Sequence, residues 1–428
     1  MNIRQKNLDY DKVMALESFK HHKPMRQIWP LAFAIRLLAN YELLLTGFKY
    51  TQENMDSVKG RPALYLMNHS CFLDLQIASR LIYPKRFSVV CTTDGFVGKA
   101  LLMRLLGCIP TRKFVSDLSL ISDIRYALNE LKTNVLMFPE AGYTFDGTAT
   151  ALPGRFGVVL KKLNVPIVVI NTRGAFLRQP LYNGLKKRRV NISAHMKCLL
   201  TPEKMENMSV NEIDELLQKE FTFDGFKWQQ ENGIRIKETF RADGLERILY
   251  KCAHCGIEGK MQGKGTKLVC KSCGKEYELD EYGFLKAAEG KTEFSHIPDW
   301  YMWQRRCVKE EIENGNYGFD IPVNIAVLKD GKALYTVGEG RLSHCLNGFT
   351  LTGCGGKLNY SQSPLSSYSL NSDYYWYKIG DVIGIGNNEI SYYCFPKNDH
   401  PVAKTRLAAE EMYKILKQRP TLGNRTIC

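Results

Sequence analysis

The stretch Leu66-Met67-Asn68-His69-Ser70-Cys71-Phe72-Leu73-Asp74 lies where an apolar run ends and a helical pattern begins. Residues 63–67 are typical of a buried strand, and apolar residues then recur at helical spacing as far as Leu81. His69 and Asp74 are five residues apart, about 140° around an ideal helix, so they meet only if His69 precedes the helix and Asp74 lies in its first turn. A carboxylate that orients an imidazole makes a general base near neutral pH. Taken alone, such a pair is more often a capping Asp beside an inert His.

Further short motifs follow in sequence order. They are Gly107-Cys108-Ile109-Pro110-Thr111-Arg112, Phe138-Pro139-Glu140-Ala141-Gly142 and Val165-Pro166-Ile167-Val168. Together with Asn68-His69 and Asp74, they resemble the four blocks of the glycerolipid acyltransferases, which acylate lysophosphatidic acid and its relatives. The resemblance covers residues 45–220 and is specific to the family, not to a substrate. It implies an α/β domain with a mixed sheet and flanking helices, in which His69 takes the proton of the acceptor hydroxyl and Asp74 holds the imidazole.

The resemblance also implies substrate-binding residues. Arg112 would help to bind the phosphate or glycerol end of the acceptor, and Glu140 would orient its glycerol hydroxyl. Asn68 and Gly142 belong to the same motifs and are included as candidates. Residues 107–112 are expected to form a loop, and residues 95–116 carry four basic residues and no acidic one, so a phosphate near this loop would meet positive charge.

The third motif departs from the family. The family usually has Gly, Thr and Arg where this chain has Ala141, Gly142 and Tyr143. An arginine grips a phosphate bidentately, whereas a phenol carries no charge. An acceptor other than plain lysophosphatidate therefore remains open. Arg173, directly after the predicted strand 166–171, is a candidate to supply the missing charge.

Composition indicates an anionic partner. The 428 residues are enough for two or three domains, 44% of them are hydrophobic, and the formal net charge is +15. Such a charge suits nucleic acid, an anionic bilayer or a phosphate-bearing substrate. Residues 155–200 contain ten basic residues and no Asp or Glu, which favours an anionic membrane surface. The absence of interleaved aromatic residues disfavours nucleic acid.

Residues 1–50 are predicted to be an interfacial, amphipathic helical segment. Its apolar run, residues 27–47, is interrupted by polar residues that are costly at a bilayer centre, and Trp29 and Tyr41 favour the headgroup level. A helix packed on the catalytic domain is the compatible alternative. No signal-peptide pattern opens the chain, and most cysteines are scattered singly. We therefore expect a cytoplasmic protein, peripheral on the inner face of the membrane.

A new unit begins after the expected acyltransferase domain, residues 51–245. Cys252, Cys255, Cys270 and Cys273 form two CxxCG knuckles separated by 14 residues. Four thiolates from two tight turns suit a closed, tetrahedral structural zinc site, with rubredoxin-like iron as the minor alternative. Residues 248–285 are therefore predicted to form a zinc ribbon. Because the acyltransferase motifs end before it, residues 1–247 are expected to fold alone and keep some activity.

The remainder, residues 292–420, is predicted to be a separate β-rich domain. Short strand-like runs separated by Gly, Asn and Asp turns follow an entry helix, and a helix over 401–417 closes the domain. This order resembles a pleckstrin-homology module. The whole chain is thus interpreted as an acyltransferase that moves an acyl group from acyl-CoA or acyl-carrier protein to a lysophospholipid or glycerol-3-phosphate-type acceptor. The alternative is a non-catalytic adaptor, associated with a membrane or nucleic acid, whose acyltransferase domain is degenerate.

Overall fold

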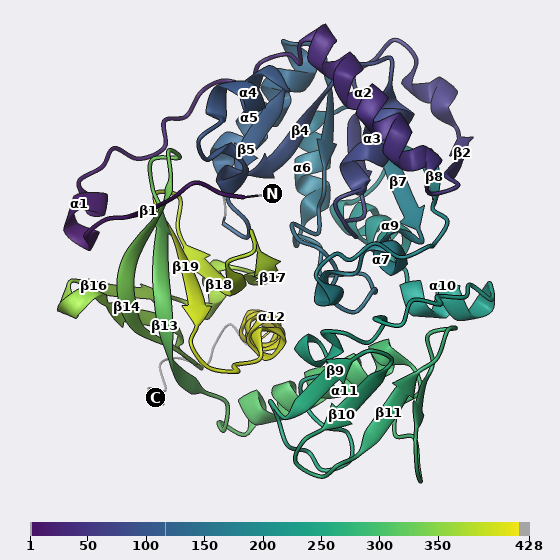
Figure 1. Ribbon diagram of the computed structural model, residues 1–428. Helices are drawn as coiled ribbons and strands as arrows, with labels where there is room; N and C mark the ends of the chain where they lie inside the picture. The colour runs from purple at the N-terminus through teal and green to yellow at the C-terminus, as the bar shows by residue number, and fades with distance from the viewer. Residues whose placement is uncertain (1, 116, 419–428) are drawn as a thin grey trace.

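The computed structural model describes residues 2–115 and 117–418. These residues form an α/β domain, a small ribbon that carries four cysteines, and a mainly-β domain closed by helix α12 (Figure 1). This arrangement confirms the predicted fold class.

The α/β domain is built on a mixed sheet with the strand order β2-β8-β7-β3-β6-β4-β5. Neighbouring strands are parallel except β7 and β8, which are antiparallel. The strands are β2 Lys49–Glu53, β3 Leu64–Met67, β4 Phe87–Thr92, β5 Cys108–Thr111, β6 Asn134–Met137, β7 Ile167–Arg173 and β8 Ser193–Leu200. Residues 108–111, predicted as loop, are a strand because they pair with β4 and bury Cys108 and Ile109.

Helices cover both faces of this sheet, which is why its central strand β3 is continuously apolar. Tyr65 and Met67 pack with residues of α2 and α3, whereas Leu64 and Leu66 pack with residues of α5, α6 and α9. These helices are α2 Trp29–Leu44, α3 Asp74–Ile82, α5 Leu118–Asn129, α6 Phe156–Leu163 and α9 Val210–Phe221. Shorter helices are α1 Tyr10–Met14, α4 Ala100–Leu105, α7 Ala175–Arg178, α8 Pro202–Glu206 and α10 Gly225–Glu231. The loops after β3, β6 and β5 leave the carboxyl ends of their strands at one edge, where α/β proteins place their sites.

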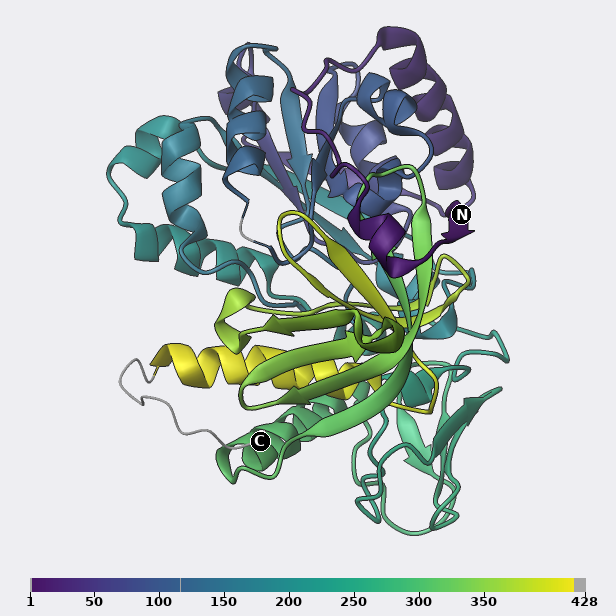
Figure 2. The same cartoon turned by 90° about the vertical axis from the view of Figure 1, so that its left-hand side faces the viewer.

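Within each of the two appended parts, neighbouring strands pair in antiparallel fashion. The ribbon has the order β12-β11-β10-β9, and the β domain has the order β16-β15-β14-β13-β19-β18-β17. The ribbon strands are β9 Met261–Lys264, β10 Lys267–Cys270, β11 Glu276–Leu279 and β12 Leu285–Ala287. The others are β13 Phe319–Leu328, β14 Leu334–Cys345, β15 Gly348–Gly353, β16 Leu358–Gln362, β17 Asn371–Trp376, β18 Gly380–Gly386 and β19 Ser391–Pro396. Helix α11, Ile297–Glu313, precedes them, and α12, Val402–Gln418, lies across the sheet (Figure 2).

The N-terminal segment is not the single helical unit predicted for residues 1–50. Residues 5–7 form strand β1, Gln5–Asn7, which pairs in parallel with β14 of the C-terminal domain. Tyr10 and Val13 are buried in the core shared with that domain, so burial of apolar side chains holds this arm in place. The helix predicted to be interfacial corresponds to α2 alone. Among the described helices, none is both long and apolar enough to cross a bilayer.

One hydrophobic core joins all the parts. It contains Phe145 and Phe176 of the α/β domain, Tyr277 of the ribbon, Trp300 of α11 and Val323 of β13. The α/β domain also has its own cores on the two faces of its sheet. The predicted independence of residues 1–247 is therefore in conflict with the packing.

Candidate active site and metal centre

His69 lies in the turn after β3, and Asp74 is the first residue of α3, as the spacing requires. His69 Nδ1 is 3.0 Å from Asp74 Oδ2. The same oxygen accepts the backbone N–H groups of Ser70, at 2.7 Å, and Cys71, at 3.0 Å, so the turn itself holds the carboxylate. A carboxylate only accepts hydrogen bonds, so Nδ1 carries the proton and Nε2 keeps a free lone pair. The structure thus brings the predicted catalytic pair together.

The surroundings favour neutral imidazole. Burial lowers the pKa of His69, the Asp74 carboxylate works against this, and the charge of Lys113 lowers the pKa further. The ring of Phe138 stacks on the imidazole with centroids 4.0 Å apart, and the Tyr143 ring lies 4.3 Å away. The His69 side chain remains 22% exposed. His69 can therefore accept a proton near neutral pH and can still be reached by a substrate.

Glu140 is a positioning residue. Its Oε2 accepts the backbone N–H of His69 at 2.8 Å, and its Oε1 accepts the N–H and hydroxyl of Thr150 at 2.9 and 3.0 Å. The carboxylate is buried, and burial raises its pKa to about 7 against the pull of these hydrogen bonds. Both oxygens are engaged by the chain, and the predicted contact with the glycerol hydroxyl stays a prediction.

The Asn68 side chain is also engaged in hydrogen bonds within the protein. Its Oδ1 accepts the backbone N–H of Thr172 at 2.8 Å and the Thr172 hydroxyl at 3.2 Å, which ties β3 to β7. The side chain is buried and supports the turn before His69 instead of facing a substrate. Gly142 is different, because a side chain built there would meet no described heavy atom within 4 Å. Its backbone remains a candidate substrate contact.

Arg112 and Lys113 follow β5 at the same edge of the sheet. Arg112 Nη2 donates to the backbone carbonyl of Glu389, at 3.4 Å, in the loop between β18 and β19. The charge of Lys113 affects the pKa of two groups. This charge lowers the pKa of His69, and it works against the burial that raises the pKa of Asp373, on β17, to about 6. The predicted phosphate contact of Arg112 stays a prediction.

Residues of the C-terminal domain hold the loop beside His69. Arg406 of α12 donates to the backbone carbonyl of Tyr143 at 3.4 Å and lies over the Phe145 ring, 4.4 Å from its centroid. The ring of Tyr374 packs on the same Phe145, with centroids 4.6 Å apart. Arg406 is buried and paired with Glu410, so it positions the loop and does not replace the family's phosphate-binding Arg. No local motif points to these residues, since they lie more than 200 positions away in the chain.

Arg173 does not join this set. It ends β7, and the neighbouring Thr172 is the residue that contacts Asn68. Adjacent strand residues point to opposite faces, so Arg173 faces away from that contact. It lines a separate groove with His195 and Glu220.

Half of the ten basic side chains of residues 155–200 are either paired with carboxylates or buried. Arg178 and Arg188 are buried and donate to backbone carbonyl groups. Lys186, Lys187 and Lys197 form ion pairs with Asp243, Glu42 and Glu220, respectively. These acidic partners lie outside residues 155–200, so a count of charges within that segment does not include them. The ten cations are therefore not a single uncompensated surface.

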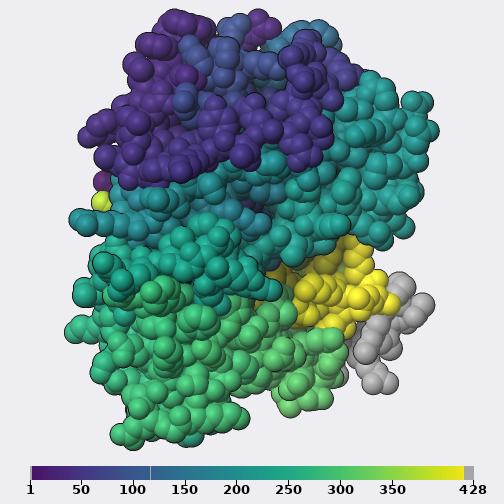
Figure 3. Space-filling model, turned by 90° about the vertical axis from the view of Figure 1, so that its right-hand side faces the viewer, coloured from purple at the N-terminus to yellow at the C-terminus, as the bar shows by residue number. Residues whose placement is uncertain are grey.

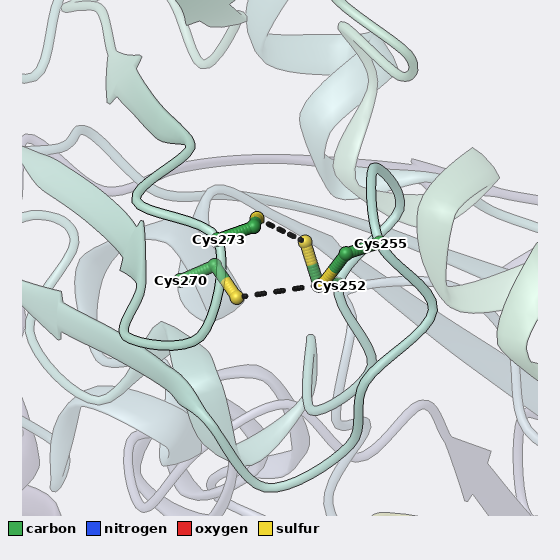
Figure 4. Close-up of side chains that lie close together, drawn as sticks. All are labelled: Cys252, Cys255, Cys270 and Cys273. Carbon is green, nitrogen blue, oxygen red and sulfur yellow. Dashed lines mark hydrogen bonds between the residues drawn. The ribbon is translucent and has the colours of Figure 1, made fainter.

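The four predicted metal ligands converge from the two knuckles (Figure 4). Their sulfur atoms all lie within 4.8 Å of one another, with Cys252 to Cys273 and Cys255 to Cys270 at 3.8 Å. Zinc–sulfur bonds of about 2.3 Å in a tetrahedron place sulfur atoms about 3.8 Å apart, so the geometry fits zinc. Each knuckle closes with a glycine at φ +76°, Gly256 or Gly274, where a side chain would be strained.

Comparison with known proteins agrees with the motifs. Residues 48–172 match the model of the Acyltransferase family, which confirms the resemblance and identifies this segment as an acyltransferase domain. Among solved structures, the chain is similar to the 1-acyl-sn-glycerophosphate acyltransferase PlsC from Thermotoga maritima, with 14% identity and a TM-score of 0.35 over 45% of this chain and 78% of that one. No curated protein matches the chain.

Proposed function

We propose that this protein transfers a fatty acyl group from a thioester donor, acyl-CoA or acyl-carrier protein, to a hydroxyl group of a lysophospholipid or glycerol-3-phosphate-type acceptor. The observation that carries the proposal is the hydrogen bond between His69 Nδ1 and Asp74 Oδ2, inside the segment that matches the acyltransferase family. The partly exposed imidazole, oriented by Asp74, supports a working catalytic base and argues against the alternative of a non-catalytic adaptor.

The residues suit direct transfer. His69 Nε2 takes the proton of the acceptor hydroxyl as its oxygen attacks the thioester carbonyl, and Asp74 stabilises the imidazolium that forms. When the carbon–sulfur bond breaks, the imidazolium returns the proton to the thiolate. Base and acid are then the same residue, and no acyl-enzyme is needed. Glu140 keeps the base in place through the His69 backbone N–H.

A membrane face is the proposed working surface, and α2 supports it. Unlike a helix at the surface of a soluble protein, this helix exposes large apolar side chains, although Ala39 and Leu43 are buried against the protein. Its polar residues face the protein, where Arg36 lies over the Tyr83 ring, 3.6 Å from its centroid, and Glu42 pairs with Lys187. Its outer side is apolar and covers the upper part of the face seen in Figure 3. Large side chains exposed on it are Trp29, Phe33, Leu37, Leu38, Tyr41 and Leu44.

The apolar surface continues to the catalytic turn. Phe72 and Leu75, three and six residues after His69, are exposed, and α3 packs directly against α2. Exposed apolar patches of this kind mark interaction sites. A lipid acceptor held in the membrane leaflet that contacts this surface would have its hydroxyl beside His69. We accordingly propose a peripheral protein of the cytoplasmic membrane face, with nucleic acid disfavoured.

The test is a transfer assay with a panel of acceptors. Purified protein is given acyl-CoA or acyl-carrier protein with lysophosphatidate, glycerol 3-phosphate and lysophospholipids that carry headgroups, and the products are followed by mass spectrometry. We expect transfer to at least one acceptor and its loss in His69→Ala. No product from any pair of donor and acceptor, with folded protein on anionic vesicles, would favour the adaptor.

A further inference from the structure

A second pocket lies at the amino ends of the parallel strands β3, β4 and β6, the edge of the α/β sheet opposite to His69. Its volume is about 440 Å³, within the range of small-ligand sites, about 300–1,000 Å³. The described residues that line it include no Asp or Glu. Its basic side chains are Arg26, Arg61, Lys85, Arg86 and Lys132. They come from four separate segments of the chain, so no local run of charge in the sequence reveals them.

Most of these cations have no counter-charge. Among the described residues, only Arg61 forms an ion pair, with Glu203 at 2.8 Å. Three others donate to backbone carbonyl groups: Arg26 to Leu131 at 3.0 Å, Lys85 to Val58 at 3.4 Å and Arg86 to Gln27 at 3.5 Å. Neutral carbonyl groups orient the side chains without cancelling their charge. The pocket therefore keeps a positive potential that attracts anions.

The floor of the pocket is fixed by hydrogen bonds. The Thr133 hydroxyl and the Asn134 amide both donate to the Arg86 carbonyl at 3.1 Å. Asn134 Oδ1 also accepts the backbone N–H of Ala63 at 3.0 Å, and both Thr133 and Asn134 are buried. These bonds join the segments that precede β3, β4 and β6. The cations are thus carried on a preorganised frame, which lowers the entropic cost of binding a ligand.

Lys132 stands at a conformation that suits another residue type. Its φ is +49°, in the left-handed region that Gly and Asn adopt more readily. The side chain is exposed and makes no hydrogen bond or ion pair with a described residue. Packing therefore does not account for a lysine at this position, and backbone strain of this kind is common where a residue serves a ligand.

The pocket borders α2, the helix proposed to lie at the membrane. Arg26 lies three residues before Trp29, the first residue of α2, whose side chain is 55% exposed. On the other side of the pocket, Tyr83 precedes Lys85 by two residues and packs under Arg36 of α2, with the guanidinium 3.6 Å from the ring centroid. Cationic and aromatic side chains together at the end of an apolar helix are typical of the headgroup level.

We propose that this pocket binds the phosphate group of an anionic membrane lipid, a monoester such as that of phosphatidate in preference to a diester. A phosphate monoester carries a charge of about −1.5 to −2 and three acceptor oxygens, which suits several converging cations. Arginine binds such a group bidentately. The inference rests on the proposed membrane location of α2 and not on acyl transfer. It gives the protein a lipid site separate from the catalytic edge.

The test is co-flotation with phosphatidylcholine vesicles that contain either phosphatidate or phosphatidylglycerol at equal surface charge. In about 0.15 M salt, charges act over only about 8 Å, so distant cations contribute little. We expect wild-type protein to prefer phosphatidate. Lys85→Gln with Lys132→Asn should weaken binding to phosphatidate vesicles about 30-fold and remove the preference. Because Asn suits the left-handed backbone, the melting temperature should not fall.

Lys237→Gln with Lys264→Gln is the matched control, since both lysines are exposed, lie outside the pocket and remove the same charge. Equal weakening in both double variants would replace the pocket with diffuse charge and overturn the inference. Calorimetry with inorganic phosphate separates the other source of this chemistry. Phosphate binding that is lost in the pocket variant, with unchanged flotation, would assign the site to a soluble phosphate compound instead of a lipid.

Flotation does not depend on turnover, so the two proposals can fail separately. Pocket-dependent binding to phosphatidate vesicles, without transfer to any acceptor, would reject the proposed acyl transfer and leave this site in place. Acyl transfer by wild-type protein that shows no preference for phosphatidate vesicles would do the reverse.

Discussion

At the scale of single residues, Asp74 offers a clean way to separate charge from geometry. All three hydrogen bonds end on Oδ2, while the buried Oδ1 has no partner among the described residues. In Asp74→Asn the amide oxygen can replace Oδ2 and the amino group can take the place of Oδ1. The turn should therefore survive, and only the support of the imidazolium should be lost.

We expect Asp74→Asn to keep the wild-type melting temperature and to lower kcat less than His69→Ala does. General-base catalysis contributes about 100- to 10,000-fold, which sets the scale for His69→Ala. Steady-state kinetics on the best acceptor, with circular dichroism as the folding control, measures both. Wild-type kcat in Asp74→Asn would exclude an electrostatic role for this carboxylate.

The second residue-scale prediction concerns pH. His69 works as the neutral base, and burial lowers its pKa, so kcat/KM should fall only as the pH drops below about 6.5, the ordinary value for histidine. The positive charge of Lys113 adds to this lowering. Lys113→Gln should therefore raise the His69 pKa and move the loss of activity to higher pH.

An NMR titration of the imidazole in the free protein measures this directly, without any effect of the substitution on substrate binding. The His69 resonance is identified by its absence in His69→Ala. Lys162→Gln, a charge change at the last turn of α6, serves as the control. An unchanged or lower pKa in Lys113→Gln would place the ammonium group away from the base.

At the scale of elements, α2 should govern membrane binding. Leu38 and Leu44 are 72% and 79% exposed, so replacing both with Ser leaves the fold intact. Burying one Leu side chain is worth about 1.5–3 kcal/mol, so the double variant should bind vesicles at least tenfold more weakly. Co-flotation with anionic vesicles is the measurement, and Leu365→Ser, 52% exposed on the C-terminal domain, is the control. Equal flotation of wild type and double variant would remove α2 from the interface.

The ribbon gives the second element-scale prediction. Metal analysis should find one zinc ion per chain, and Cys252→Ser or a chelator should unfold the ribbon, because metal binding contributes about 10–16 kcal/mol in small zinc domains. Trp300 is a probe of this unfolding because it contacts the ribbon. Its Nε1 donates to the Lys251 carbonyl at 2.9 Å, and its ring contacts Tyr277. Tryptophan fluorescence should change in Cys252→Ser and stay constant in Cys307→Ser, whose thiol lies outside the cluster. Native protein without zinc or iron would contradict the site.

At the scale of the whole molecule, the shared core predicts that residues 1–247 do not fold stably alone. Phe145 would lose the ring of Tyr374, and Tyr10 would lose Tyr392, both contributed by the rest of the chain. Aromatic side chains bury about 150–250 Å² each, so exposing even half of that area costs several kcal/mol, against a typical stability of about 5–15 kcal/mol.

We expect the fragment to aggregate or to lack a cooperative melting transition, with the full-length chain as the reference in the same buffer. Circular dichroism and size-exclusion chromatography decide the outcome. A monomeric fragment that melts cooperatively would show that the two faces of the α/β sheet suffice.

The sequence by itself determined what short stretches of chain bring together. His69 and Asp74 meet across one turn, and each CxxCG knuckle places its two thiolates through local backbone geometry, so residue type and spacing suffice. The buried strands β3 and β6 and the helix α9 were predictable for the same reason, because apolar patterning reports the faces that must be buried. Residues 108–111 were missed because four residues with Pro110 carry too little pattern to reveal a strand.

Only the tertiary structure decided what depends on residues far apart in the chain. Strand β1 pairs with β14, more than 300 positions away, and Asp243, Glu42 and Glu220 neutralise lysines that look unpaired in sequence. The same holds for the engagement of Glu140 and Asn68, the separate groove of Arg173, and the contact of Arg112 with the C-terminal domain. Hydrogen bonds and ion pairs act over a few ångströms in space, whatever the separation in sequence, so local patterns carry no record of them.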